Sequence, residues 1–206
     1  MKFLLILLLS LTQFSWADSK IPGQLTIALG SISANYSENP DNLTSTDGTS
    51  KTTASNPYSG TASSMPLALT YEYFPNLKRA YFGKVAGPLL ASSPDRYFSA
   101  TTGINFYFGK VATLAVVSDI NFEMKLIPKL RYYAGPALGV GYLVYNTKSA
   151  IKNDLLFELG GQGGVIYTIN PKWVFRAELG AARGIGALVS STIIKILLGV
   201  SYNLGN

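Results

Sequence analysis

Residues 191–204, Ser-Thr-Ile-Ile-Lys-Ile-Leu-Leu-Gly-Val-Ser-Tyr-Asn-Leu, alternate between two kinds of side chain. Every second residue from Ile194 to Leu204 is apolar, and the positions between them are mostly small or polar, with Lys195 the one charge. Successive side chains of a β-strand point to opposite faces, so this stretch predicts a strand with one apolar face. Such alternation is typical of strands that cross a membrane as part of a closed barrel.

The other end of the chain has the pattern of an export signal. Residues 1–17 contain Lys2, an apolar run over 3–11, and the small residues Ser15 and Ala17 at the −3 and −1 positions of a cleavage site. The run is shorter than the roughly 20 residues that a membrane-spanning helix needs. We therefore expect a cleaved signal peptide at 1–17 and one mature domain at 18–206.

The composition agrees with a barrel. Of the 206 residues, 48% are hydrophobic and only 14% are charged, yet no apolar run after the signal reaches 18 residues. This excludes helical membrane spans and fits strands that alternate lipid-facing and lumen-facing side chains. A soluble β-sandwich or lipid-binding barrel is the alternative, and the many apolar residues of the predicted outward faces count against it.

Two residue types are missing, which limits the chemistry. The chain has no cysteine, which excludes disulfides, cysteine metal sites and a lipid anchor on cysteine. It also has no histidine, the usual general base and the commonest metal ligand. We therefore expect no enzyme activity, no cofactor and no metal.

The formal net charge is +6, but the lysines and arginines are scattered, and no nucleic-acid-binding motif accompanies them. Nucleic acid is therefore not an expected partner. A basic exported protein is better suited to anionic lipid head groups.

Eight segments show strand alternation, each long enough to cross a membrane at a tilt. An even number suits a barrel with both termini in the periplasm. The polar stretch 37–63 is expected to be the first external loop, and a change of apolar phase near Gly30 predicts a bulge. The eight segments are 24–36, 64–74, 96–108, 113–127, 130–145, 153–169, 172–183 and the closing strand 191–204.

Residues 77–94 leave the strand count open between eight and ten. They contain Tyr81, Phe82, Val85, Leu89 and Leu90, and could form a further strand or a structured turn. We expect a long periplasmic connection here, so that 96–108 runs outward; the alternative is a further strand in a ten-stranded barrel. The aromatic residues at strand ends predict two girdles, with Phe106 and Phe108 in the outer one.

Three segments resemble the small outer-membrane β-barrel superfamily, whose OmpA-like and OmpX-like members have eight strands. Residues 132–142, Tyr-Tyr-Ala-Gly-Pro-Ala-Leu-Gly-Val-Gly-Tyr, are similar to the family's glycine-alternating strand. Residues 169–178 resemble its periplasmic turn and following strand, and 199–204 its closing strand. The chain departs from the family by ending in Leu204-Gly205-Asn206 instead of an aromatic residue, and Pro136 within a strand suggests a bulge.

The resemblance implies a porin-like protein of a Gram-negative outer membrane. It also implies contact with outer-membrane lipid and lipopolysaccharide, and the barrel-assembly machinery as a partner during insertion. An external ligand is not indicated.

Charged residues recur on the faces that are expected to line the lumen. An eight-stranded barrel is just wide enough for side chains to fill, so these acids and bases must pair. Glu123 and Arg131 flank one turn, and Arg176 and Glu178 share a face. The expected lumen network, structural or gating, consists of Glu72, Asp119, Glu123, Lys125, Arg131, Glu158, Arg176, Glu178 and Lys195.

Three functions are compatible with this pattern. The first is a structural or surface-interaction barrel with a plugged lumen, which the sequence favours. The second is a small channel or a carrier for ions or apolar molecules. The third, an outer-membrane enzyme with paired carboxylates, is disfavoured by the absence of histidine.

Overall fold

The computed structural model describes residues 23–39, 58–76, 78–91, 93–108, 112–116, 122–126, 129–147, 150–170 and 172–204, and these form ten β-strands. The predicted signal peptide, 1–17, lies outside these ranges. No helix in the described part of the chain is long and apolar enough to cross a membrane.

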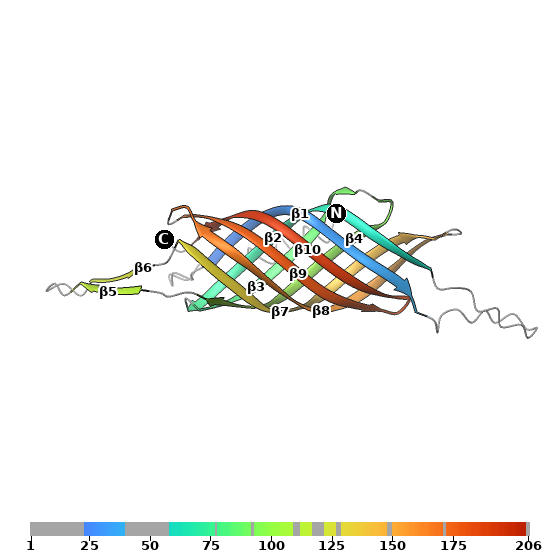
Figure 1. Ribbon diagram of the computed structural model, residues 1–206. Helices are drawn as coiled ribbons and strands as arrows, with labels where there is room; N and C mark the ends of the chain where they lie inside the picture. Colours follow the sequence, from blue (N-terminus) through green and yellow to red (C-terminus); the bar gives the residue numbers. More distant parts are fainter. Residues whose placement is uncertain are drawn as a thin grey trace, which may run out of the picture.

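Eight of the ten strands form a closed barrel (Figure 1). Going round the wall, the order is β1-β10-β9-β8-β7-β4-β3-β2, and every neighbouring pair is antiparallel. The remaining strands, β5 and β6, pair only with each other. The strands are β1 (Gly23–Glu38), β2 (Ser59–Asn76), β3 (Arg79–Ala91), β4 (Arg96–Phe108), β5 (Ala112–Val116), β6 (Phe122–Leu126), β7 (Leu130–Asn146), β8 (Ile151–Thr168), β9 (Trp173–Gly186) and β10 (Val189–Asn203).

The first and last barrel strands close the wall. β1 pairs with β10 without interruption from Gln24 opposite Asn203 to Glu38 opposite Val189. We call the end where β1 begins and β10 ends the terminal end, and the other end the distal end. The predicted closing strand, 191–204, is therefore confirmed, and it lies beside the first strand.

The strands are tilted, and the pairing register measures the tilt. A row of directly paired residues that starts at Ile27 passes once round all eight strands and returns to β1 at Ser37. The row has climbed ten residues along β1 toward the distal end. Half a circuit therefore raises a row by about five residues, as expected for strands tilted to close a barrel.

Side chains alternate between an apolar outer wall and a filled lumen. On β10, Ile194, Ile196, Leu198 and Val200 are exposed on the outside, whereas the residues between them are buried. The same alternation occurs on the other barrel strands and gives the outside an apolar band. This pattern is the one that a barrel wall in lipid requires.

The predicted count of eight strands is correct, but one member was assigned wrongly. Residues 77–94 contain the barrel strand β3, which lies between β2 and β4. Consequently β4 runs back toward the terminal end, not outward as expected. The weak alternation of β3 has a simple cause: its outward positions include Gly83 and Gly87, which add little apolar signal.

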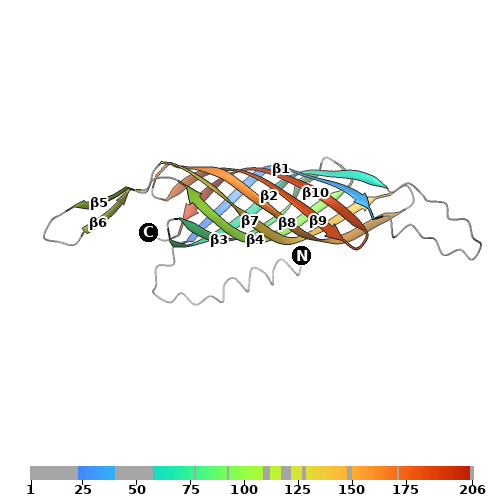
Figure 2. The same cartoon turned by 60° about the horizontal axis from the view of Figure 1, so that its bottom comes forward.

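The segment 113–127 is not a barrel strand. It contributes to β5 and β6, a separate two-stranded hairpin that projects beyond the terminal end, between the end of β4 and the start of β7 (Figure 2). β4 and β7 pair directly with each other in the barrel wall. The alternation of 113–127 therefore indicated strand structure correctly but not its place.

Two local expectations are also wrong. No register shift occurs at Gly30 against β10 or at Pro136 against β8. The irregularities lie instead between β2 and β3, at Met65/Pro66 and at Tyr73/Asn76. Phe106 and Phe108 are exposed at the terminal end, with Phe108 opposite Tyr132, because β4 runs in the opposite direction from the one expected.

Candidate functional site

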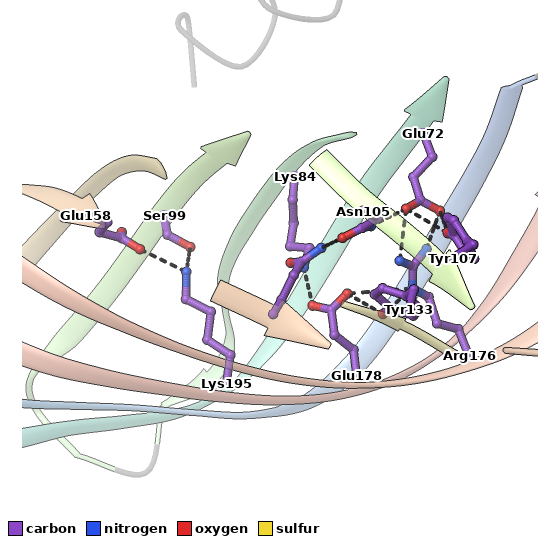
Figure 3. Close-up of polar contacts among 11 residues, drawn as sticks. Glu72, Lys84, Ser99, Asn105, Tyr107, Tyr133, Glu158, Arg176, Glu178 and Lys195 are labelled. Carbon is purple, nitrogen blue, oxygen red and sulfur yellow. Dashed lines mark hydrogen bonds and ion pairs between the residues drawn. The ribbon is translucent and has the colours of Figure 1, made fainter. Parts of the chain in front are cut away.

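The lumen near the terminal end and at mid-height is filled by charged and aromatic side chains. They point inward from β2, β3, β4, β7, β8, β9 and β10 (Figure 3). Glu72 is 0% exposed and Arg176 is 2% exposed, so their charges are taken out of water. Such burial is stable only if each charge is paired and its remaining hydrogen bonds are satisfied.

Glu72 and Arg176 form a two-pronged ion pair near the terminal end. The Nη1 atom of Arg176 lies 2.5 Å from Glu72 Oε2, and its Nη2 atom donates to Glu72 Oε1 at 3.0 Å. Asn105 and Tyr107 also donate to this carboxylate. The parallel geometry matches the planar guanidinium to the carboxylate, so the pair is fixed in direction as well as held by charge.

Glu178 continues the network toward mid-height. Arg176 Nε donates to the Tyr133 hydroxyl at 2.8 Å, and that hydroxyl donates to Glu178 Oε2 at 2.8 Å. Lys84 forms an ion pair with the other oxygen of Glu178 and donates to Gln162 Oε1 at 2.6 Å. Hydrogen bonds therefore run without a break from Glu72 to Lys84.

A second ion pair lies farther toward the distal end. Lys195 Nζ is 3.0 Å from Glu158 Oε2 and donates to Ser99 Oγ at 3.1 Å. Tyr97 donates its hydroxyl hydrogen to the other oxygen of Glu158. Figure 3 shows this group separated from the larger network.

A cavity of about 20 Å³ lies between the two groups. Lys84 and Glu178 line it on one side, Lys195 and Glu158 on the other, and Gln162 contributes as well. A water molecule needs about 10–15 Å³ on the same measure, so the cavity has room for about one. This space is far too small for a continuous water-filled channel.

The distal half of the lumen is apolar. Ile32, Leu143, Leu156 and Ile193, each at most 1% exposed, belong to a cluster that fills the space between the strands. Tyr36 and Tyr145 pack against each other there, with ring centroids 5.0 Å apart. The apolar phase change at Gly30 has its explanation here, because the lumen side of β1 changes from polar to apolar while the strand continues in register.

Acidic residues fasten the distal turns to this plug. Asp95 accepts from the Tyr36 hydroxyl at 2.8 Å and from the backbone N–H of Asn146 at 2.9 Å. Asp154 accepts from the backbone N–H groups of Leu188 and Val189 at 2.8 and 2.9 Å. Asp95 thereby ties the start of β4 to β1 and β7, and Asp154 ties β8 to the start of β10.

The structure brings together most of the predicted lumen residues, but not all. Glu72, Glu158, Arg176, Glu178 and Lys195 lie in the two groups above. Arg131 also points into the lumen, with its guanidinium 4.5 Å from the centroid of the Tyr107 ring.

Three predicted residues are not placed in the lumen. Asp119 lies outside the described residues. Glu123 and Lys125 lie on β6, which is not part of the barrel wall, so their expected position on a barrel strand is wrong. The predicted pairing of Glu123 with Arg131 stays a prediction.

The sequence did not single out several members of the network. Lys84 was missed because its segment was assigned to a connection. Tyr97, Tyr107 and Tyr133 lie in predicted strands, but no pattern in the sequence marks a tyrosine as the partner of a buried carboxylate. A phenol between two charged groups becomes recognisable only once the strand register is known.

Nothing in the described part of the chain resembles a metal site, because no group of three or more acidic residues converges there. The arrangement holds charges in place and fills space.

Comparison with solved structures supports the architecture. Neisserial surface protein A superposes with a TM-score of 0.53 at 11% identity, over 86% of this chain and 96% of that protein. The fold is that of the small eight-stranded outer-membrane β-barrels. At this identity the similarity concerns the fold alone.

Two further small barrels match less closely. The attachment invasion locus protein Ail of Yersinia pestis has a TM-score of 0.45 at 15% identity and covers 88% of this chain and 98% of its own. OprG from Pseudomonas aeruginosa has a TM-score of 0.42 at 14% identity and covers 89% and 96%. No protein-family model and no curated protein sequence matches the chain.

Proposed function

We propose that the protein is an integral barrel of a bacterial outer membrane that acts through its wall and its outer loops, and not through its lumen. The main support for this proposal is the filling of the lumen, which combines paired buried charges with an apolar distal plug. A solute would have to break the Glu72–Arg176 and Lys84–Glu178 pairs and displace the plug in order to pass. The role is therefore structural or one of surface interaction, without catalysis.

The proposal includes the route to the membrane. Residues 1–17 act as a cleaved export signal, and the barrel-assembly machinery inserts the mature chain into a bilayer with lipopolysaccharide in its outer leaflet. The exposed apolar band of the barrel, with Trp173 and Tyr202 in edge contact at the terminal end, supports this location. The distal end then faces outward, because the termini of such barrels lie in the periplasm.

Two measurements test the proposal. The membrane location requires that the protein fractionates with outer membranes and that its unheated form migrates differently from its heated form on a gel. A soluble protein without this mobility shift would contradict it.

The plugged lumen is tested by conductance in planar bilayers. We expect no channel steps from the wild-type protein, because paired charges and the apolar distal cluster fill the described lumen. Regular steps that change on Lys84→Gln or Glu178→Gln substitution would instead favour the small channel.

A further inference from the structure

The outer wall carries a polar strip at the seam between the first and last strands. Arg183 on β9 is paired with Thr192 on β10, which is paired with Asn35 on β1, which is paired with Thr61 on β2. All four are exposed on the outside of the barrel. Ser33, Ser63 and Ser190 lie beside this row on the same outer face and complete what we call the seam strip.

The opposite wall is apolar at the same height. The outward row from Ser63 passes through Ser33, Ile194 and Ala181 to Gly161 on β8, half a circuit away. Because half a circuit climbs about five residues, Ser63 stands level with residues 155–157 of β8. Leu155 and Phe157 are exposed there, so the apolar band reaches this level on β8, whereas polar side chains have replaced it at this level on β1, β2 and β10.

Arg183 is the one charged residue of the strip, and it points into the region that lipid surrounds. Its guanidinium donates to Thr192 Oγ1 at 3.2 Å and to Ser190 Oγ at 3.1 Å, both neutral hydroxyls. No carboxylate of the described residues lies within ion-pairing distance of it. A guanidinium has five N–H donors, so this one keeps donors and an uncompensated charge on the outer wall.

An unpaired arginine on the lipid face is unfavourable unless a polar or anionic group reaches it. The nearby side chains of the strip are hydroxyls and an amide, which suit the sugar hydroxyls and phosphate oxygens of a head group. A guanidinium binds phosphate oxygens through two parallel hydrogen bonds. Acyl chains offer none of these partners.

We propose that the seam strip binds the phosphate-bearing sugar head group of an outer-leaflet glycolipid, with Arg183 contacting the phosphate. This inference rests on the proposed outer-membrane location and adds a specific lipid site to it. The outer surface of the bilayer then lies closer to mid-barrel at the seam than at β7 and β8. The hydroxyls of Ser190 and Thr192 hold the guanidinium in the orientation that meets the phosphate.

The test counts retained lipid. The folded protein is reconstituted in phosphatidylcholine vesicles containing lipopolysaccharide and extracted into mild detergent, and bound lipid is counted by native mass spectrometry. We expect the wild-type protein to keep lipopolysaccharide and the Arg183→Gln variant to keep at least five-fold less. Arg96→Gln, which removes an exposed arginine of β4 outside the strip, is the matched control and should keep as much as the wild type.

Further arms identify the chemical group that is bound. Dephosphorylated lipopolysaccharide should be retained no better by the wild type than by Arg183→Gln, and millimolar inorganic phosphate should not displace the intact lipid. Equal retention by wild type and Arg183→Gln would overturn the proposal. So would displacement by free phosphate, or a dimer that forms through the strip in place of lipid binding.

A failure of the proposed function would look different. In that case the protein would not insert into the vesicles or show the heat-dependent gel shift at all. Insertion with a normal gel shift but no dependence on Arg183 would reject the lipid site alone.

Discussion

Lys84 on β3 and Glu178 on β9 form an ion pair across the full width of the lumen, since four strand-to-strand steps separate β3 from β9 around the wall. Lys195 on β10 reaches Ser99 on β4 across an equally wide span. These contacts connect walls that share no backbone hydrogen bonds. The barrel is therefore fixed from inside as well as along its strands, and this makes specific demands on individual residues.

Breaking the Glu72–Arg176 pair on one side should destabilise the barrel strongly. Arg176→Met leaves Glu72 buried without its counter-charge, and we expect a loss of about 3–5 kcal/mol in the free energy of unfolding. Urea titration in phosphatidylcholine vesicles, followed by the fluorescence of Trp173, measures it. Lys152→Gln, which removes a partly exposed ion pair with Glu38, should cost only about 0–1 kcal/mol.

A double variant separates the cost of an unpaired charge from the value of the pair. Glu72→Leu combined with Arg176→Met should recover most of the stability lost by Arg176→Met, because no lone charge remains buried. A double variant as unstable as the single one would show that the ion pair itself holds the strands together.

Replacing Gly135 and Gly83 by alanine should change the stability of the barrel in opposite directions. A Cβ atom on Gly135 would lie 1.7 Å from the backbone oxygen of Ile104, so Gly135→Ala must push β4 and β7 apart and should cost about 1–3 kcal/mol. A Cβ atom on Gly83 would have nothing within 4 Å, and Gly83→Ala should stabilise β3 by about 0.5–1 kcal/mol. The same unfolding titration tests both, and equal effects would contradict the register described for β4 and β7.

The β5–β6 hairpin should be dispensable for the barrel. Replacing residues 110–128 by a short Gly-Ser turn leaves the direct pairing of β4 with β7 intact, so the heat-dependent gel shift should persist. Removing 79–91 takes out a wall strand and should abolish the shift. Loss of the shift in both variants would place 113–127 in the wall after all.

The seam should be wetter than the opposite wall at equal height. The chain has no cysteine, so Ser63→Cys and Leu155→Cys each give one site for a nitroxide label. A water-soluble nickel complex should reach the label at 63 several-fold better than the label at 155, and dissolved oxygen should show the reverse order. Equal accessibility would mean that the apolar band ends at one height all round.

The strand pattern predicted most of the fold, and the exceptions have physical causes. The ends of strands with bulky outward residues, such as β4 and β10, were predicted to within two residues. A strand that faces lipid on one side and the lumen on the other alternates clearly between apolar and other residues. β3 was missed because glycines occupy part of its outward face. The pattern could not show that the two strands of the segment 113–127, β5 and β6, pair with each other and not with the barrel. Alternation indicates that a segment is a strand but does not indicate which strand lies beside it.

The candidate site was predicted in part. Buried charges such as Glu72 and Arg176 were recognisable from their place on inward faces, because a charge there needs a partner. The partners were not recognisable, since Lys84 meets Glu178 only through the ring order of the strands. The apolar distal plug was missed for a related reason: Ile32 and Tyr36 resemble lipid-facing residues until the uninterrupted register of β1 turns them inward.

The β1–β10 seam has a consequence for chain connectivity. The backbone N–H of Leu204 donates to the carbonyl of Gly23 at 2.8 Å, so the ends of the described chain lie side by side. A short linker from 204 to 23, with new ends opened within the β5–β6 hairpin, would keep every strand beside its present neighbours. The fold therefore depends on the cyclic order of the strands around the barrel and not on the strand at which the chain starts. A circularly permuted gene should encode the same barrel.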